Sequence, residues 1–294
     1  MSALSSALDA LAAIVGEEHL VTETQAASEY GVEGQRPVAV AMPGSSEEVA
    51  ELLRAASEQR LSVLIRGSGS LLHLGAPPGP MGLVVSLARL NQIVEYDADD
   101  LTVTAQAGMT LGALQQTIGE HGQMLPLDPP GPGSATLGGI AATNLSGPMR
   151  MRHGGPRDMV IGLRVALTNG TVVKTGGKTV KNVAGYEMNK LFVGSLGTLG
   201  AICELTMRLT PVPEARAMMV ASLATLEAEE VAARLSAARL DVATLEVANH
   251  AACARMHISL PVTVEAGRWV VFAGLMGARE AIERQEREVR ELVG

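Results

Sequence analysis

The chain has 294 residues, enough for one large domain or two ordinary ones, and with 47% hydrophobic but only 2% aromatic residues its core must be aliphatic. The formal net charge of −8 and the absence of any basic run argue against nucleic acid and against an anionic membrane surface as partners. Cys203 and Cys253 are too few for a disulfide framework or for an iron–sulfur cluster, which needs about four thiolates.

The N-terminal segment has no signal-peptide pattern, because acidic residues interrupt its apolar ones and no basic region precedes them. No apolar stretch reaches about 18 residues, so we expect no direct membrane span. The expected location is cytoplasmic, and any peripheral place at the inner membrane would come through partners.

Periodic and alternating residues predict the following elements in the first part of the chain. They are a helix over 4–15, a strand over 37–43, a helix from Ser45 onward, and strands over 61–65, 82–87 and 101–105. A helix from 110 to about 121 follows. The strand over 61–65 runs straight into a glycine-rich stretch.

The later part of the chain begins with a hairpin over 160–174, in which Asn169-Gly170 suits a type I′ turn. A strand over 201–209 leads to Pro211-Val212-Pro213, which is the best domain boundary. Beyond it we expect strands over 218–222, 242–247 and 269–272, and helices over 226–240 and 278–292. The charges of residues 280–290 are typical of a solvated helix face.

Three glycine-rich stretches, over 66–75, 129–147 and 194–200, carry the most information. A backbone without side chains can approach a pyrophosphate closely and point several N–H groups at it. The first stretch is no Rossmann fingerprint, because Leu72 stands where the third glycine belongs, and Gly177-Lys178-Thr179 is no P-loop, because Val172 replaces the required glycine. One such stretch could equally be a tight turn, but three beside strands favour a nucleotide site.

Together with residues 125–129, 135–139, 143–144, 152–154 and 181–187, these stretches resemble the FAD domain of the p-cresol methylhydroxylase and vanillyl-alcohol oxidase family. The likeness covers roughly residues 35–212 and is strongest to subunits of bacterial glycolate oxidase and to D-lactate dehydrogenase. It implies an α+β fold: a two-lobed FAD-binding domain of the p-cresol methylhydroxylase (PCMH) type over 1–212, with lobes of about 1–90 and 91–212. A short, truncated α/β substrate cap would follow over 213–294.

The resemblance also implies which residues hold FAD. Backbone N–H groups and hydroxyls near the first glycines would cradle the pyrophosphate, the second stretch would line the ribityl chain and ring edge, and the third would offer backbone contacts. The implied set is Arg66, Gly67, Ser68, Gly69, Ser70, Leu71, Pro129, Gly133, Ser134, Thr136, Leu137, Gly138, Gly139, Thr143, Asn144, Gly147, Gly200 and Ile202.

Departures from the family pattern refine this expectation. Ser70 stands where members with covalent flavin have a histidine, so the FAD should be non-covalent, while Ser68 replaces a glycine and can still donate a hydrogen bond. His73 is interpreted as a loop residue. The family's metal motif is absent, since His250 and His257 are the only histidines after residue 153, so we expect no metal. Leu196 replaces the family's usual acidic residue.

For two sets of polar residues, the sequence allows more than one role. Lys181 or Tyr186, near Lys178 and Glu187, could face the flavin and stabilise its reduced form, or could belong to a solvated loop. A second group could bind a carboxylate or a partner, or could pair internally; it comprises Arg150, Arg152, His153, Arg157 and Asp158.

The resemblance therefore implies an FAD-binding subunit of a glycolate or D-2-hydroxyacid oxidising complex. A sister FAD-containing subunit would oxidise the small 2-hydroxyacid, and an iron–sulfur subunit would receive the electrons. No catalytic residue is assigned in this chain. The alternatives are a self-sufficient FAD-dependent 2-hydroxyacid oxidoreductase and a flavin-free scaffold, with an enzyme of UDP-N-acetylmuramate synthesis a more distant fourth.

Overall fold

A computed structural model describes residues 3–23, 27–75, 78–131, 133–177, 187–256 and 259–293. The chain forms two compact units. The first comprises Met1–Leu125, Pro129–Leu145 and Gly155–Thr210, and the second comprises Pro126–Asp128, Ser146–Gly154 and Pro211–Gly294. Two short segments from the middle of the chain thus group with its C-terminal part, which the linear division at residue 212 does not anticipate.

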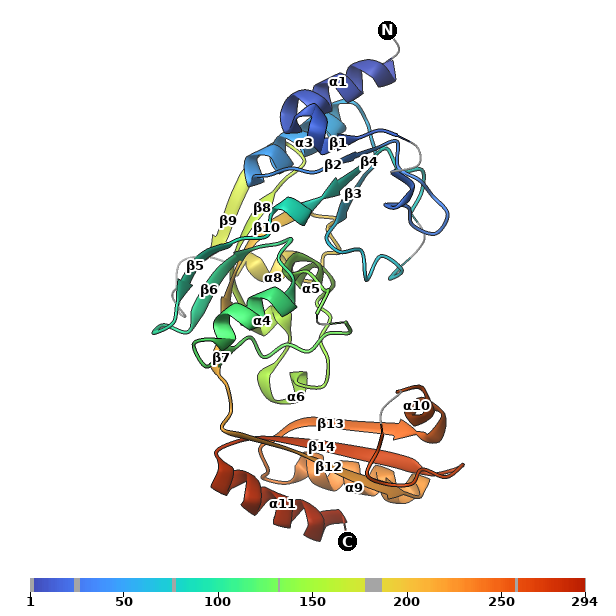
Figure 1. Ribbon diagram of the computed structural model, residues 1–294, viewed down its shortest axis with the longest axis vertical. Coiled ribbons are helices and arrows are strands. Elements are labelled where there is room, and N and C mark those ends of the chain that lie inside the picture. The colour runs from blue at the N-terminus through green and yellow to red at the C-terminus, as the bar shows by residue number, and fades with distance from the viewer. Residues whose placement is uncertain are drawn as a thin grey trace. The chain divides into compact units, whose positions relative to one another are not determined.

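The first unit opens with a four-stranded sheet of order β1-β2-β4-β3, in which β2, β4 and β3 run parallel and β1 runs antiparallel (Figure 1). Its strands are β1 (Leu20–Val21), β2 (Ala39–Ala41), β3 (Val63–Arg66) and β4 (Leu83–Ser86). Its helices are α1 (Ala3–Val15) and α3 (Ser46–Glu58), with η1 (Glu17–His19) and η2 (Leu87–Arg89) as single 3₁₀ turns. The Ser45 side chain caps α3 by accepting a hydrogen bond from the Glu48 N–H.

A five-stranded antiparallel sheet of order β5-β6-β10-β8-β9 forms the rest of the first unit. Its strands are β5 (Ile93–Asp97), β6 (Thr102–Gln106), β8 (Val160–Ala166), β9 (Val172–Gly176) and β10 (Ala201–Arg208). Helix α3 contacts both this sheet and β4, so the two sheets share one helix layer. The connecting elements are α4 (Leu111–Gly119), β7 (Gln123–Met124), α5 (Leu137–Thr143), α7 (Pro156–Met159) and α8 (Asn189–Phe192).

The β8–β9 turn differs from the expected type I′ turn. A type I′ turn needs positive φ at both central residues, but of Asn169 and Gly170 only the glycine has it, at φ +84°. The Gly170 N–H bonds to the Leu167 carbonyl, and the Leu167 N–H bonds to the Thr171 carbonyl. The expectation was wrong because Asn169 uses its side chain to accept from Thr171 instead, which suits a three-residue turn closed by glycine.

The second unit contains a three-stranded antiparallel sheet of order β12-β14-β13 with helices α9 and α11 along one of its faces (Figure 1). Its elements are α6 (Arg150–His153), β12 (Ala215–Leu223), α9 (Thr225–Ala237), β13 (Val242–Asn249), α10 (His250–Arg255), β14 (Trp269–Gly277) and α11 (Arg279–Val293). The short strand β11 (Thr210–Pro211) pairs with β7 where the chain leaves the first unit. The α+β architecture expected from the sequence is confirmed.

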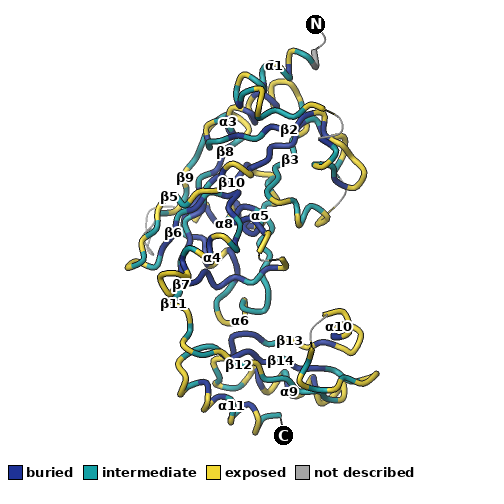
Figure 2. The backbone as a smooth tube through the Cα atoms, viewed as in Figure 1, coloured by how far each residue is buried: buried dark blue, intermediate teal, exposed yellow. Residues whose placement is uncertain are grey.

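Buried residues concentrate in the sheets and in the helix faces that cover them (Figure 2). The largest fully buried side chains are all leucine, isoleucine or methionine, as the scarcity of aromatic residues requires. In the second unit, Val231 and Leu235 of α9 and Ile282 and Val289 of α11 pack in one core cluster with the sheet residue Val271. This packing of apolar helix stripes on a sheet face stabilises each unit mainly through the burial of aliphatic surface.

Candidate functional site

The first and second glycine-rich stretches are far apart in the sequence, but they contact each other at Gly67 and Thr136. Strand β3 delivers Gly67, and a Cβ atom at this position would stand only 2.1 Å from Thr136 Oγ1. Thr136 is held from the other side, because the Leu137 N–H bonds to the Met109 carbonyl and the Leu111 N–H to the Ala135 carbonyl, each at 2.9 Å. The absence of a side chain at residue 67 therefore allows the two segments to touch.

The turn after β3 presents a row of backbone donors. Among the described residues, the four N–H groups from Ser68 to Leu71 donate no hydrogen bond to the protein. Gly69 takes φ +82°, a conformation that side chains disfavour, and the Ser68 and Ser70 hydroxyls lie 3.3 Å apart. Successive unpaired N–H groups in such a turn form an anion-binding concavity.

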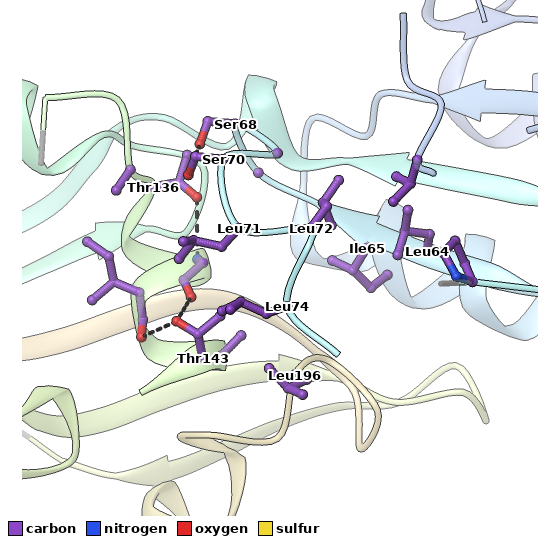
Figure 3. Close-up of a pocket in the computed structure, with 18 residues that line it drawn as sticks. Leu64, Ile65, Ser68, Ser70, Leu71, Leu72, Leu74, Thr136, Thr143 and Leu196 are labelled. Carbon is purple, nitrogen blue, oxygen red and sulfur yellow. Dashed lines mark hydrogen bonds between the residues drawn. The ribbon is translucent and has the colours of Figure 1, made fainter. Parts of the chain in front are cut away.

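These segments enclose one side of an open pocket of about 180 Å³ (Figure 3). Predicted residues that line it are Gly67, Ser68, Gly69, Ser70, Leu71, Thr136, Gly139 and Thr143. Thr136 also caps α5 by accepting from the Gly139 N–H at 3.3 Å, and the Thr143 hydroxyl donates back to the Gly139 carbonyl at 2.8 Å. The pocket thus has a polar side with unpaired donors, which fits a pyrophosphate.

Other residues predicted for the site lie beside this pocket without lining it. Arg66 places its guanidinium 4.9 Å from the Tyr30 ring centre, and Gly69 leaves room for that side chain. Leu137 and Gly138 are buried in α5, where the Gly138 N–H bonds to the Ala107 carbonyl. The Pro129, Gly133 and Ser134 segment leads into Thr136. For this group, a cofactor contact remains a prediction.

The remaining predicted residues are further along the chain. Asn144 ends α5 in the left-handed conformation, with φ +52°, and its side chain accepts from the Arg157 N–H. Gly200 and the buried Ile202 lie at the start of β10. Gly147 groups with the second unit, where a Cβ would stand 2.0 Å from the Asp128 carbonyl oxygen. Their roles at FAD also remain predictions.

The polar residues for which the sequence left two roles open lie partly outside the described residues. Lys178, Lys181 and Tyr186 lie outside the described residues, while Glu187 pairs with Lys190 at 2.6 Å. In the second group, Arg152 forms an ion pair of 2.8 Å with Asp241 and donates to the Met276 carbonyl.

The other members of the group around Arg152 have different surroundings from one another. The Asp158 side chain accepts from the Gly155 N–H, while Arg150 and Arg157 are exposed. Burial, and then the neighbouring Arg152, lower the pKa of His153. His73 is exposed in the turn after the first glycines. Within the described residues, no group of three or more His, Cys, Asp or Glu could hold a metal ion.

The Asp128 side chain connects the two mid-chain segments that group with the second unit, Pro126–Asp128 and Ser146–Gly154. Its carboxylate accepts the Met149 N–H at 3.0 and 3.2 Å, and burial raises its pKa despite that bond. An open pocket of about 570 Å³ beside it uses the sheet face opposite α9 and α11, with Arg216, Met218 and Glu246 among its lining residues.

Several pocket residues of the first unit escaped the sequence prediction. They are apolar: Val32, Leu64, Ile65, Leu72, Leu74, Pro78, Ala135, Ile140, Ala142 and Leu196. Leucines directly after the glycines were a usable signal, because they sit in a loop without an alternating pattern. Val32 and Ala142 carry no such signal, since only tertiary contacts bring them to the pocket.

The comparisons with known proteins agree with this geometry. Residues 37–176 match the model of an FAD binding domain family. The fold is similar to that of a solved alkyldihydroxyacetonephosphate synthase (TM-score 0.82, 18% identity, covering 98% of this chain and 59% of that one). It is also similar to p-cresol methylhydroxylase (TM-score 0.80, 18% identity, covering 99% and 64%). Residues 37–176 thus resemble an FAD-binding domain, and the fold is that of p-cresol methylhydroxylase and its structural relatives.

Three characterised relatives are similar in sequence to this chain. Glycolate oxidase subunit GlcD of Bacillus subtilis is 38% identical over 192 residues, 65% of this chain and 41% of that protein. D-2-hydroxyglutarate dehydrogenase of Xanthomonas citri pv. viticola is 39% identical over 208 residues, covering 69% and 44%. Glycolate oxidase subunit GlcE of Escherichia coli is 39% identical over 171 residues, covering 58% and 48%. The chain spans less than half the length of each of these relatives.

Helices of membrane-spanning length and apolarity are not found in the part of the chain that the structure describes.

Proposed function

We propose that this chain is an FAD-dependent oxidoreductase subunit that serves the oxidation of glycolate or another D-2-hydroxyacid. The observation that carries the proposal is a pocket lined by Thr136 and by Ser68–Leu71, whose N–H groups donate to no described residue; all of these residues lie inside the region that matches the FAD-binding family. The relatives named as glycolate oxidase subunits and as D-2-hydroxyglutarate dehydrogenase support the substrate class.

In this proposal the turn from Ser68 to Leu71 holds the pyrophosphate through backbone N–H groups, with the hydroxyls of Ser68, Ser70 and Thr136 beside it. Bound FAD would supply the redox chemistry, the two-electron, two-proton oxidation of the hydroxyl-bearing carbon to a carbonyl. The protein's part is to hold the cofactor and to exclude water. Because Ser70 offers no histidine for attachment, the cofactor is held non-covalently.

Partner proteins are proposed from the names of the relatives. We propose a sister FAD-containing subunit that meets the hydroxyacid and an iron–sulfur subunit that receives the electrons. The likeness to both GlcD and GlcE, two subunits with glycolate oxidase names, supports an assembly of this kind.

The relative named as D-2-hydroxyglutarate dehydrogenase favours the self-sufficient alternative, in which this chain would reduce its FAD directly with the hydroxyacid.

The test uses the purified full chain. Its visible spectrum is recorded, the protein is precipitated with acid, and flavin absorbance is sought in the supernatant. The intact protein is then mixed anaerobically with glycolate, D-lactate or D-2-hydroxyglutarate. Non-covalent flavin that stays oxidised until a partner subunit is added supports the relay proposal, whereas bleaching by hydroxyacid alone at enzymatic rates supports the self-sufficient enzyme. A colourless chain that takes up no added FAD overturns both and leaves a scaffold.

A further inference from the structure

The sheet of the second unit has an open edge along β12. Among the described residues, β14 is the only strand that pairs with β12, whereas β13, at the other edge of the sheet, contacts helix α6 (Figure 1). Strand β12 is nine residues long, and none of these residues is buried. Its outer side therefore presents a row of main-chain N–H and C=O groups that no described strand bonds, and such a row is a template for pairing with another strand.

The β12 edge also lacks the features by which proteins protect an exposed strand from pairing. Those features are bulges, prolines, several charged side chains or a covering element. Strand β12 pairs with β14 in one continuous register, contains no proline and carries a single charged residue, Arg216. Strand β13, by contrast, has a register shift and carries the exposed Glu246. The unprotected edge is thus specific to β12.

The open part of β12 runs from Ala215 to Ala221. Beyond it, the Arg268 guanidinium donates to the carbonyl and hydroxyl oxygens of Ser222 and so occupies that end of the strand. Met218 lies at the centre of the open part and is 57% exposed. A large apolar side chain thus faces solvent in the middle of an unprotected edge, which is typical of a surface that another polypeptide covers.

A mainly apolar pocket opens at the same edge. Its volume is about 260 Å³, and its lining includes Met219, Val220 and Ala221 of β12 and Val289 and Val293 of α11. Side chains of consecutive strand residues point to opposite faces of a sheet. A pocket that touches all three β12 residues therefore reaches around the edge of the strand. A strand added at this edge would cover the pocket and remove its apolar lining from water, which favours pairing.

We infer that β12 is an interface at which a second copy of this chain adds its own β12 in antiparallel orientation. The two strands are related by a two-fold axis at Met218, so that the two sheets become one continuous sheet. Because α6 contacts β13 at the other edge, the assembly ends at a dimer. This inference goes beyond the proposed function and does not depend on the use of FAD.

The distribution of charge along β12 favours a second copy as the occupant. With Met218 at the axis, Arg216 lies opposite Val220 of the second copy, so no like charges face each other directly. The aliphatic stem of Arg216 can cover the valine while its guanidinium stays in water. At the axis itself, the two Met218 side chains meet as an apolar cross-strand pair.

Opposite charges meet at the two ends of the same register. Glu214, the residue before β12, falls opposite Ser222 of the second copy, on whose oxygens the Arg268 guanidinium lies. The Glu214 side chain is 61% exposed, and its ion pair with Arg279 is long, at 3.7 Å. Its carboxylate can therefore approach Arg268 of the second copy, and the two-fold axis repeats this pair at the other end. Complementary charge of this kind fixes the register of an interface.

The experiment measures the dimer Kd of the purified full chain by analytical ultracentrifugation over a range of concentrations. Met218→Lys and Met218→Glu each place two like charges opposite each other at the axis, whereas an equimolar mixture of the two variants places opposite charges there. Val247→Lys is the matched control, because Val247 is 39% exposed on β13, at the other edge of the same sheet. The Tm of each variant reports whether the fold is kept. Hydrogen exchange of the wild-type amides over 215–221, at low and high protein concentration, locates the interface without any substitution.

We expect the wild-type chain to be dimeric at about 100 μM and its amides over 215–221 to exchange more slowly as the concentration rises. Each Met218 variant should raise the dimer Kd about tenfold, because like charges then oppose each other across the two strands. The mixture should dimerise at least about fivefold more tightly than either variant alone, and Val247→Lys should stay within about twofold of wild type.

The inference is overturned if the wild-type chain is monomeric at about 100 μM, if both Met218 variants dimerise as wild type does, or if mixing them restores nothing. It is also overturned if exchange over 215–221 does not change with concentration. A monomer whose β12 amides become protected only when another subunit is added overturns it in favour of a strand from that subunit.

Discussion

Thr136 Oγ1 lies 2.1 Å from the point where a Cβ atom of residue 67 would stand, so glycine at 67 is required for the two halves of the pocket to meet. Gly67 directly follows β3, which pairs with β4, and backbone hydrogen bonds fix the residues on both sides of Thr136, so moving either residue away would cost free energy. The contact links a loop at the end of a parallel strand to the first residue before α5.

Gly67→Ala should therefore separate the two segments and weaken FAD binding. The added methyl group must displace Thr136 or the turn, and overpacking of this kind costs about 1–3 kcal/mol of stability. The Kd for FAD and the free energy of unfolding measure the two effects. Gly79→Ala is the matched control, since among the described residues no atom beyond its two chain neighbours lies within 4 Å of its would-be Cβ, and its φ is outside the left-handed region. Equal behaviour of the two variants would contradict the prediction.

Thr136→Val should destabilise α5, because valine keeps the shape of threonine but cannot accept the Gly139 N–H. Loss of an N-cap acceptor costs about 1 kcal/mol. Chemical denaturation of the flavin-free chain measures this loss. Thr136→Ser retains the oxygen and should recover most of the stability; if serine is as unstable as valine, the capping bond is not the cause.

Burial raises the pKa of the Cys203 thiol to about 12, even though the thiol also has hydrogen-bonding neighbours. The folded state therefore holds this proton more tightly than the unfolded state, whose thiol titrates near pH ~8.5. The stability that the group contributes is complete below about pH 8.5 and is lost as the pH rises towards 12. Wild-type unfolding free energy should fall between pH 8 and 10 more steeply than that of Cys203→Ala. Parallel curves would refute the prediction.

The pKa of Asp128 is raised chiefly by burial, so the folded state disfavours the carboxylate relative to the carboxylic acid. Its effect on stability is most favourable below the unfolded pKa of about 3.9 and declines as the pH rises through the folded value. Asp128→Asn keeps an oxygen for the Met149 N–H and should be more stable than wild type at pH 7.

That advantage should disappear below about pH 4, where wild-type Asp128 is protonated. Thermal unfolding from pH 3.5 to 7.5 measures the difference. Asp99→Asn changes the net charge equally at an exposed position and should show no crossover of this kind. An Asp128→Asn variant that is less stable than wild type throughout the range would contradict the prediction.

Local sequence patterns predicted most of the regular elements. The start signal at Ser45 and the apolar stripe after it predicted α3, and the alternation over 201–209 predicted β10, because apolar periodicity records which face is buried. The patterns missed α5, whose glycines and threonines read as a continuous loop, and β5, whose side chains are mostly exposed. Capping by Thr136 and packing on β10 form the helix despite its weak propensity.

The sequence by itself determined the chemistry of the turn after β3, because glycine and serine at 67–70 set the backbone's freedom and its hydroxyl groups whatever surrounds them. It also determined that the core is aliphatic. Only the tertiary structure decided that Thr136 meets Gly67, that Leu196 is held with positive φ at the pocket, and that Asp128 joins the second unit. These relationships depend on hydrogen bonds and close contacts between residues distant in the chain, which no local pattern records.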